Sequence, residues 1–429
     1  MISRAADADP GEALTRACRE ELAGRAGSDW ELYRKWGQSR ESVTTPTRRS
    51  ESLRREEGWA ARWWEEGASH FASGSDAEGL RRAIAQAAHT RVRPSPPPRW
   101  PLGRSSPNVA DVPLEPPPDI WENLTRQLSA ESRGEALLTH LTLRRGRATE
   151  RIENGAGLDV SQTFQWTDGI AGAVGRRGAR ACEARLVFRC EGEPDCAPVA
   201  RRLADRAILP LSGEGSPFPR GEWLLDPSVA AAVLAGIAPL FTADRPPRWL
   251  NRARFAAPAI TILDDATADA GFDGEGTPTR RVVLVDGGEL TGRLFDLSSA
   301  AAAGGRSTGH GVRPSYRVPP AAGPRRLFFE TGAGARPLDM LPSVRRGLFA
   351  SALTAPPRID LASDAFDVEF TGIVVVAGRA QHPVASARAR GRLSQLLRRV
   401  VSVATDRQFF PAPFLTGAPT LLIERADFE

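Results

Sequence analysis

Four carboxylates lie close together in the middle of the sequence, at Asp264, Asp265, Asp273 and Glu275. Carboxylates at such spacing can act as a general acid and base, or supply oxygen ligands to a metal ion. The stretch is also rich in glycine and leads into an apolar hairpin, residues 282–290, whose turn falls at residues 286–288. In this second interpretation the acids are solvated loop residues. The spacing favours the loop and leaves the catalytic interpretation open.

A second glycine-rich stretch, residues 304–311, reads GGRSTGHG and resembles a phosphate-binding loop. It lacks the GxxxxGK[ST] pattern, and Lys35 is the only lysine of the chain. We therefore expect a flexible loop whose backbone approaches an extended ligand closely, because glycine has no side chain to prevent such an approach.

The cysteines offer a third candidate site. Cys18 stands alone, whereas Cys182, Cys190 and Cys196 are clustered, without a CxxC pair or a nearby histidine. In a reducing compartment we expect free, mostly buried thiols. Zinc binding by the cluster and a disulfide between Cys190 and Cys196 remain alternatives.

Composition narrows the class of protein. The 429 residues carry a formal charge of +5, with arginines interspersed among acids, and no basic stripe or module suggests nucleic-acid binding. No apolar run reaches the length of a membrane span, and the charged N-terminus does not resemble a signal peptide. We expect a cytoplasmic chain without membrane contact. Because a single core rarely exceeds roughly 250–300 residues, we expect two domains.

The first predicted domain, residues 1–215, is α/β, and a proline-rich crossing lies within it at residues 91–119. Hydrophobic spacing predicts its helices and strands. The helices are expected at residues 9–22, 75–87, 120–128 and 197–207, and the strands at residues 30–36, 50–55, 58–64, 70–73, 137–143, 158–166 and 184–189.

The second predicted domain, residues 216–429, is β-rich, so the expected fold class is α+β. Short apolar runs alternate with turn residues through this half of the chain. The expected strands are residues 260–263, 281–285, 289–295, 326–330, 366–376 and 420–423, and the expected helices are residues 226–240 and 392–399.

Several motifs in this half occur together in a fixed order: FDGEGTPTR at residues 272–280, the hairpin at 282–290, GRLFD at 292–296 and STGHGVR at 307–313. In these motifs the chain resembles the TldD/PmbA (TldE) family. Supporting similarity includes the pattern Gly58…Arg62…Gly67…Ser73, together with residues 370–372 and 417–421.

The resemblance implies two-domain subunits that pair as a heterodimer around a cavity for unfolded or small peptides. The TldD-like subunit carries HExxxH, in which two histidines hold zinc and the glutamate activates water, and a later cysteine completes the site. The TldE-like subunit has the same fold without this motif.

This chain has five histidines, His70, His89, His140, His310 and His382, and no two of them lie within one helical turn. The corresponding helix, residues 227–241, has no titratable side chain, and residues 401–429 contain no cysteine. We therefore predict a non-catalytic TldE-like subunit, with no metal or cofactor of its own and zinc on a TldD-like partner. Two alternatives remain: an active metallopeptidase that uses the cysteines or the 264–275 acids, and a peptide-binding or assembly protein without protease activity.

No residue is predicted to be catalytic or to bind metal. The residues predicted to shape or brace the substrate cavity or interface, from their match to the motifs, are Glu275, Arg280, Ser307, Thr308, Gly309, His310 and Arg313. His310 is expected either to bond a peptide or to face solvent or a partner. Trp63 and Trp64 must point to opposite faces of a strand, so one is expected in the core and one at an interface.

Overall fold

The computed structural model describes residues 10–87, 97–102, 104–105, 114–115, 119–190, 192–212, 221–242, 247–268, 270–332, 336–411 and 414–426. Most of the predicted proline-rich crossing and the predicted domain boundary at 215/216 lie outside these residues, as does Asp9 at the start of the first predicted helix. None of the helices that the structure describes combines the length and apolar character that crossing a lipid bilayer requires.

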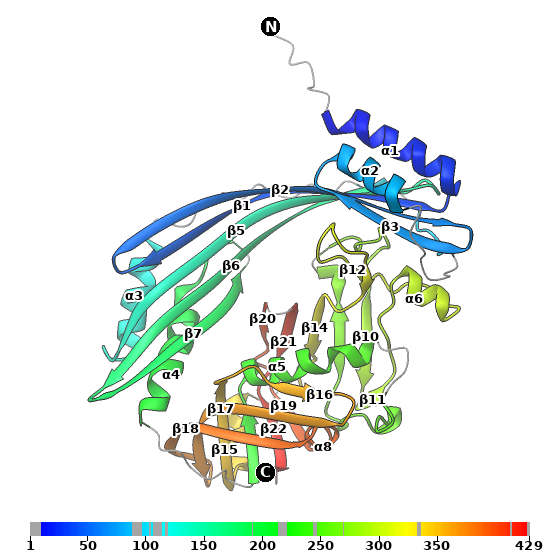
Figure 1. Ribbon diagram of the computed structural model, residues 1–429. Helices are drawn as coiled ribbons and strands as arrows, with labels where there is room; N and C mark the ends of the chain where they lie inside the picture. The colour runs from blue at the N-terminus through cyan, green and yellow to red at the C-terminus, as the bar shows by residue number, and fades with distance from the viewer. Residues whose placement is uncertain are drawn as a thin grey trace.

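Residues 30–190 contribute one long, curved sheet that arches over the rest of the molecule (Figure 1). Its order in the described residues is β3-β2-β1-β5-β6-β4, with β7 paired to β6. The strands are β1 (Trp30–Thr45), β2 (Arg48–Glu65), β3 (Ala68–Gly74), β4 (Arg104–Ser105), β5 (Ala136–Asn154), β6 (Asp159–Arg177) and β7 (Arg180–Cys190).

Two pairs of helices cover this sheet. Helices α1 (Pro10–Ala26) and α2 (Ala77–Ala87) pack on the outer face of β1 and β2, where Leu22, Leu80 and Ile84 are completely buried. Helices α3 (Ile120–Glu131) and α4 (Cys196–Ser212) pack on β5, β6 and β7. Alternate residues of β1 therefore face opposite layers, because successive strand side chains point to opposite sides.

Residues 221–426 form the remaining sheets, and no strand of this half joins the N-terminal sheet in the described residues. One sheet has the order β11-β10-β9-β14-β21-β20, and another has β16-β17-β15-β8-β22-β19 with β18 paired to β17. The strands are β8 (Gly221–Leu225), β9 (Ile262–Asp265), β10 (Arg281–Asp286), β11 (Glu289–Leu290), β12 (Gly311–Val312), β13 (Ala321–Ala322), β14 (Arg326–Phe329), β15 (Arg346–Leu353), β16 (Arg358–Asp360), β17 (Ala365–Val376), β18 (Arg379–Arg392), β19 (Val400–Val403), β20 (Gln408–Phe410), β21 (Leu415–Ala418) and β22 (Leu421–Ala426).

Helix α5 (Pro227–Ile237) lies in the apolar core between these sheets. Asp226 caps it by accepting the backbone N–H of Ser228 at 2.8 Å, and Pro227 fits the first turn, where no backbone donor is needed. The short helices α6 (Leu297–Ala302), α7 (Pro337–Met340) and α8 (Leu393–Arg398) complete this half. The predicted α+β fold class is confirmed.

Two local predictions were wrong. The strand expected at residues 289–295 ends at Leu290, because the N–H groups of Thr291 and Gly292 both turn back to the Leu284 carbonyl. Trp63 and Trp64 do point to opposite faces, but both are buried. Trp63 lies under α1 and α2, and the other face of β2 is covered where Trp64 packs edge-on against Trp100.

A small apolar cluster joins the inner face of the curved sheet to the C-terminal half. Tyr33, Ala60 and Ile152 of the sheet pack against Phe272 and Tyr316. The contact is so close at β2 that a Cβ atom on Gly58 would lie 2.3 Å from the Tyr316 ring. Phe272 belongs to the first family-like motif and Tyr316 follows the last one. The segments that carry these motifs therefore also pack against the curved sheet.

Candidate functional site

Asp273 organises the first motif loop. Its carboxylate accepts the backbone N–H groups of Glu275 and Thr277, both at 2.9 Å, and that of Gly311 at 2.7 Å. These bonds fold the loop on itself and tie it to the second motif, at residues 307–313. Burial raises the pKa of Asp273, and the three backbone donors oppose that rise.

Next to this loop lies a set of buried titratable side chains, which we call the buried charge cluster: Glu31, Arg62, Glu275 and Arg313. Arg62 Nη2 lies 2.9 Å from Glu31 and 2.7 Å from Glu275, and Arg313 Nη2 pairs with the other oxygen of Glu31. Arg313 Nε also donates to the Gly274 carbonyl at 3.1 Å. The cluster thus connects β1 and β2 to both motif loops.

Electrostatics explain how these charges are tolerated inside the protein. Burial acts to lower the pKa of the Arg62 guanidinium, but the Glu31 and Glu275 carboxylates outweigh it, so that pKa is raised. Burial raises the pKa of Glu275. The Arg62 guanidinium lowers it, whereas the Asp273, Asp296 and Glu31 carboxylates raise it further. Glu275 accepts the Leu297 N–H at 2.6 Å, at the start of α6.

His310 forms a second buried pair with Asp264, and both side chains are completely inaccessible to solvent. His310 Nε2 lies 3.0 Å from Asp264 Oδ1, and Nδ1 lies 2.9 Å from the Thr308 carbonyl oxygen. Asp264 also accepts the Arg325 N–H at 3.0 Å. The expectation that His310 bonds a peptide or faces solvent or a partner was wrong, since the 307–313 loop folds inward over β9.

The remaining residues of this loop hold its shape. Ser307 Oγ donates to the Phe295 carbonyl at 3.0 Å, and Thr308 Oγ1 accepts the Phe295 N–H at 2.8 Å. Gly309 has a positive φ of 75°, and a Cβ there would lie 2.3 Å from the Pro278 carbonyl oxygen. Ser307, Thr308 and Gly309 therefore brace the two motif loops against each other.

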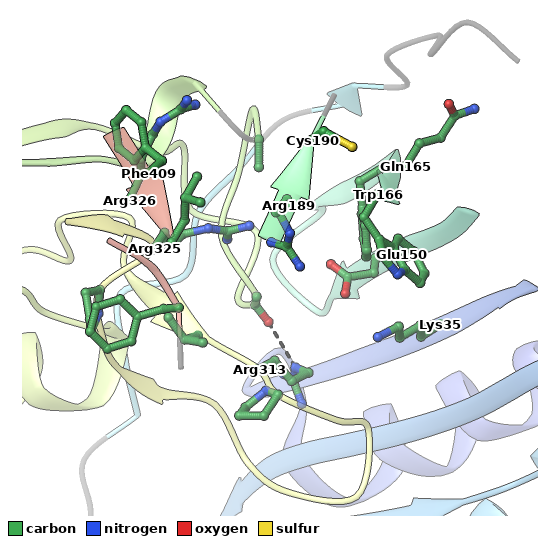
Figure 2. A pocket seen from close by; sticks show the side chains of 18 residues that line it. Lys35, Glu150, Gln165, Trp166, Arg189, Cys190, Arg313, Arg325, Arg326 and Phe409 are labelled. Carbon is green, nitrogen blue, oxygen red and sulfur yellow. Dashed lines mark hydrogen bonds between the residues drawn. The ribbon is translucent and has the colours of Figure 1, made fainter. Parts of the chain in front are cut away.

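A cavity of about 710 Å³ opens beside the buried charge cluster, between the curved sheet and the C-terminal loops (Figure 2). Arg313 belongs both to the cluster and to the cavity wall, and its guanidinium lies 4.4 Å above the Tyr33 ring. Glu150, also on the wall, accepts the Tyr33 hydroxyl at 2.8 Å. Burial, reinforced by Glu150, raises the pKa of Tyr33, which keeps this hydroxyl a donor.

Arg280 lies apart from these residues. It is exposed and lines a separate cavity of about 530 Å³, together with Ser307, Trp100 and the 304–306 loop. The structure therefore divides the predicted residues. Arg313 lines the larger cavity, Arg280 and Ser307 line the smaller one, and Glu275 and His310 are buried and line neither.

The residues present do not fit a zinc site. Helix α5 contributes valine, alanine, leucine and isoleucine side chains to the core, and its one hydroxyl, at Ser228, bonds to Asp226 at 2.6 Å. No group of three or more histidine, cysteine or acidic side chains in the described residues is arranged to hold a metal ion. The 264–275 acids are already hydrogen-bonded, as Asp264, Asp273 and Glu275 show, so they do not form an open acid-base pair.

The four cysteines are free thiols, so the disulfide considered between Cys190 and Cys196 is not formed. Burial raises the pKa of the Cys190 thiol to about 11, and it also raises the pKa values of Cys182 and Cys196. Protonated thiols are poor nucleophiles and poor metal ligands.

Glu31 and Tyr33 of the N-terminal half were not predicted as site residues, nor were Lys35 and Arg325, which line the larger cavity. One signal was present in the sequence: Glu31, Tyr33 and Lys35 alternate along one strand and share a face. Arg62 stood in the family-like pattern, but its partner Glu275 is too distant in sequence for the pattern to pair them.

Comparisons with known proteins found a matching domain model and similar folds. Residues 224–429 match the model of the PmbA/TldA metallopeptidase C-terminal domain. TldE from Thermococcus kodakarensis is similar in structure, with a TM-score of 0.82 at 17% identity, covering 97% of this chain and 99% of that one. A Thermotoga maritima protein described as a candidate modulator of a DNA gyrase has a TM-score of 0.78 at 16% identity, covering 96% and 97% of the two chains. These two similarities establish the fold.

Curated relatives match over shorter stretches. A metalloprotease of Synechocystis is 32% identical over 103 residues, which cover 23% of this chain and 22% of the relative. A metalloprotease TldD homolog of Buchnera aphidicola is 24% identical over 159 residues, covering 36% and 32%. The matches thus span about a third or less of these relatives' lengths. The matched C-terminal domain and the shared fold confirm the resemblance to the TldD/PmbA family.

Proposed function

We propose that this chain is a non-catalytic, TldE-like subunit of a heterodimeric zinc metallopeptidase that cleaves unfolded or small peptides, with leader-peptide processing as one such task. Its role is to complete the substrate cavity of a TldD-like partner that carries HExxxH and zinc.

The observation that carries this proposal is the chemistry of helix α5. The family resemblance implies zinc ligands on the helix in this position, yet α5 presents side chains such as Val229, Val233 and Leu234, all buried in the core. A hydrolytic zinc site needs three protein ligands and an open position for water. Core packing and a zinc site are incompatible uses of the same helix face.

The larger cavity supports a role in substrate binding. At about 710 Å³ it has the size of a typical ligand site, and Arg313 is held at its wall by the buried charge cluster. In this role Glu275 positions Arg62 and the start of α6, while Ser307, Thr308 and Gly309 fix the loop behind the wall.

The far end of β2 supports a partner surface. Among the described strands, residues 48–57 pair with β1 on one side only, since β3 joins β2 from Trp59 onward. Most side chains of this stretch are exposed on both faces of the sheet, and Leu53 is 50% exposed. A long strand edge with an exposed apolar side chain is a suitable docking site for a second protein.

The test is a tagged pull-down of the full-length chain from its native cells, with bound proteins identified by mass spectrometry. The proposal predicts a near-stoichiometric partner of similar size that contains HExxxH. Leu53→Asp should reduce its recovery, whereas Leu338→Asp, at a 75% exposed position on α7, should not. Recovery of only the chain itself would contradict the proposal and favour the assembly protein without protease activity.

A further inference from the structure

The larger cavity has a strongly one-sided charge. Among the described residues that line it, five are cationic and Glu150 is the only acid. The cations come from both halves of the chain, with two from the curved sheet and three from the C-terminal half; they are Lys35, Arg189, Arg313, Arg325 and Arg326. Figure 2 shows the side chains of Arg189 and Arg325 extending toward the middle of the cavity.

Some of these side chains already have partners within the protein, and the Arg189 charge is neutralised. Arg189 pairs with Asp168 through two hydrogen bonds, at 2.7 and 3.3 Å, and Arg326 stacks on the Phe409 ring at 4.7 Å. Glu150 accepts a hydrogen bond from Tyr33. The wall therefore keeps a cationic excess that these internal contacts do not use.

Lys35 and Arg325 carry that excess, and Arg313, which is paired with Glu31, adds a nitrogen that lacks an acceptor. Lys35 and Arg325 form no ion pair with an acid in the described part of the chain, and Lys35 Nζ lies 5.8 Å from the centre of the Phe164 ring. Arg313 has a side chain that is only 1% exposed, and its Nη1 atom has no hydrogen-bond partner. A buried guanidinium nitrogen without a partner is costly, because it has lost water without gaining an acceptor. An anion in the cavity would supply that acceptor.

The rest of the wall indicates what kind of molecule bears the anion. Four aromatic rings line the cavity, at Phe164, Trp166, Phe409 and Phe414. Strand β20 contributes Phe409 and pairs only with β21 among the described strands, so one of its edges is free of a strand partner. Aromatic walls beside a strand edge suit an extended peptide, whose backbone can pair with the edge.

We propose that this cavity binds an extended peptide through a carboxylate, with Lys35, Arg313 and Arg325 as the groups that recognise the charge. The carboxylate is either the peptide's C-terminus or an acidic side chain. Guanidinium and carboxylate groups form strong charge-assisted hydrogen bonds, which makes this selection specific. The inference rests on the proposed function only for the source of the peptide; the binding itself is a property of this chain alone.

The experiment measures binding of fluorescein-labelled short peptides to the purified full-length chain, without any partner, by fluorescence anisotropy. One peptide contains glutamates and a free C-terminus, a second has glutamines in their place, a third keeps the glutamates but ends in an amide, and a fourth has glutamines and an amide and so carries neither carboxylate. Loss of affinity in the second or in the third identifies the side chain or the C-terminus as the source of the carboxylate.

Lys35→Met and Arg325→Met should each weaken binding of the acidic peptide by about tenfold, the loss of one charge-assisted contact. Arg345→Met is the matched control, because its side chain is 91% exposed at a site that does not line the cavity. It should leave the affinity unchanged. Circular dichroism shows whether each variant is folded.

Equal affinity for the acidic peptide and for a peptide with neither carboxylate would overturn the inference, as would absence of binding or insensitivity to both substitutions. Because no partner and no peptidase activity enter the measurement, its failure leaves the proposed subunit role standing. Failure of the pull-down likewise leaves carboxylate binding standing.

Discussion

The Arg62 guanidinium on β2 lies 2.7 Å from the Glu275 carboxylate in the first motif loop, and both side chains are buried. The same guanidinium nitrogen is 2.9 Å from Glu31 on β1. One arginine thus connects two strands of the N-terminal sheet to a loop of the C-terminal half. The family-like motifs therefore help to hold the two halves together beside the cavity.

Arg62→Met should lower the free energy of unfolding by about 3–5 kcal/mol, because it removes the buried guanidinium that lies between Glu31 and Glu275 and leaves Glu275 without its cationic partner. Urea denaturation followed by circular dichroism measures the change. Arg388→Met is the control, since Arg388 pairs with Asp367 on the exposed face of β17 and β18 at 2.6 Å; exposed pairs contribute little. Equal stability of Arg62→Met and the wild type would contradict the role of the cluster.

Glu275 gives stability a specific dependence on pH. Its pKa in the folded protein is raised by burial, so the folded state retains a proton that the unfolded state releases above about pH 4.5. The contribution of Glu275 to the free energy of unfolding is therefore complete below about pH 4.5, and it decreases as the pH rises towards the raised pKa. Glu275→Gln removes this titration. The variant should be less stable than the wild type at low pH, and this difference in the free energy of unfolding should shrink as the pH rises, by on the order of 1 kcal/mol per pH unit. Urea denaturation of both proteins from about pH 4.5 upward measures this difference. A difference that grows with pH would show that the pKa of Glu275 is not raised in the folded protein.

His310→Ala should lower the free energy of unfolding by about 2–4 kcal/mol, since it opens a cavity and removes a donor from the buried Asp264. His382→Ala, at an exposed position on β18, should leave stability nearly unchanged. Thermal and urea unfolding of the two variants provide the comparison. A His310→Ala protein as stable as His382→Ala would show that the 3.0 Å contact contributes nothing.

Gly58→Ala should destabilise the protein by about 1–3 kcal/mol, because its Cβ would lie 2.3 Å from the Tyr316 ring. Gly24→Ala is the opposite case. Gly24 lies within α1 with no atom within 4 Å of a new Cβ, and alanine in a helix is favoured by about 0.5–1 kcal/mol. Denaturant midpoints should therefore move in opposite directions. A shift in the same direction for both would indicate that the curved sheet does not rest closely on Tyr316.

Much of the fold followed from local patterns in the sequence. Apolar spacing placed α2, α3, α4 and α5, and period-two alternation located parts of β1, β2, β5, β6 and β7. Strand ends were less accurate: residues 50–55 and 58–64 were expected as two strands but form one, β2. The charged outer half of β2 carries no hydrophobic signal, because neither of its faces is covered by the core.

The site was predictable only in part, for a physical reason. Glu275 and Arg313 were chosen from motifs, but their partners Glu31 and Arg62 lie on the other half of the chain, and only tertiary packing brings them together. His310 illustrates the same limit. Nothing near it in sequence shows that Asp264 will lie 3.0 Å away, so its burial could not be inferred.

The most direct test of the central claim is peptidase activity of this chain, purified alone and co-purified with the proposed HExxxH-containing partner, on a fluorescent peptide. The account predicts no hydrolysis by the chain alone and chelator-sensitive hydrolysis by the pair. That activity should be abolished when the glutamate of the partner's HExxxH becomes glutamine. Chelator-sensitive hydrolysis by this chain alone, at the rate of the pair, would contradict the account.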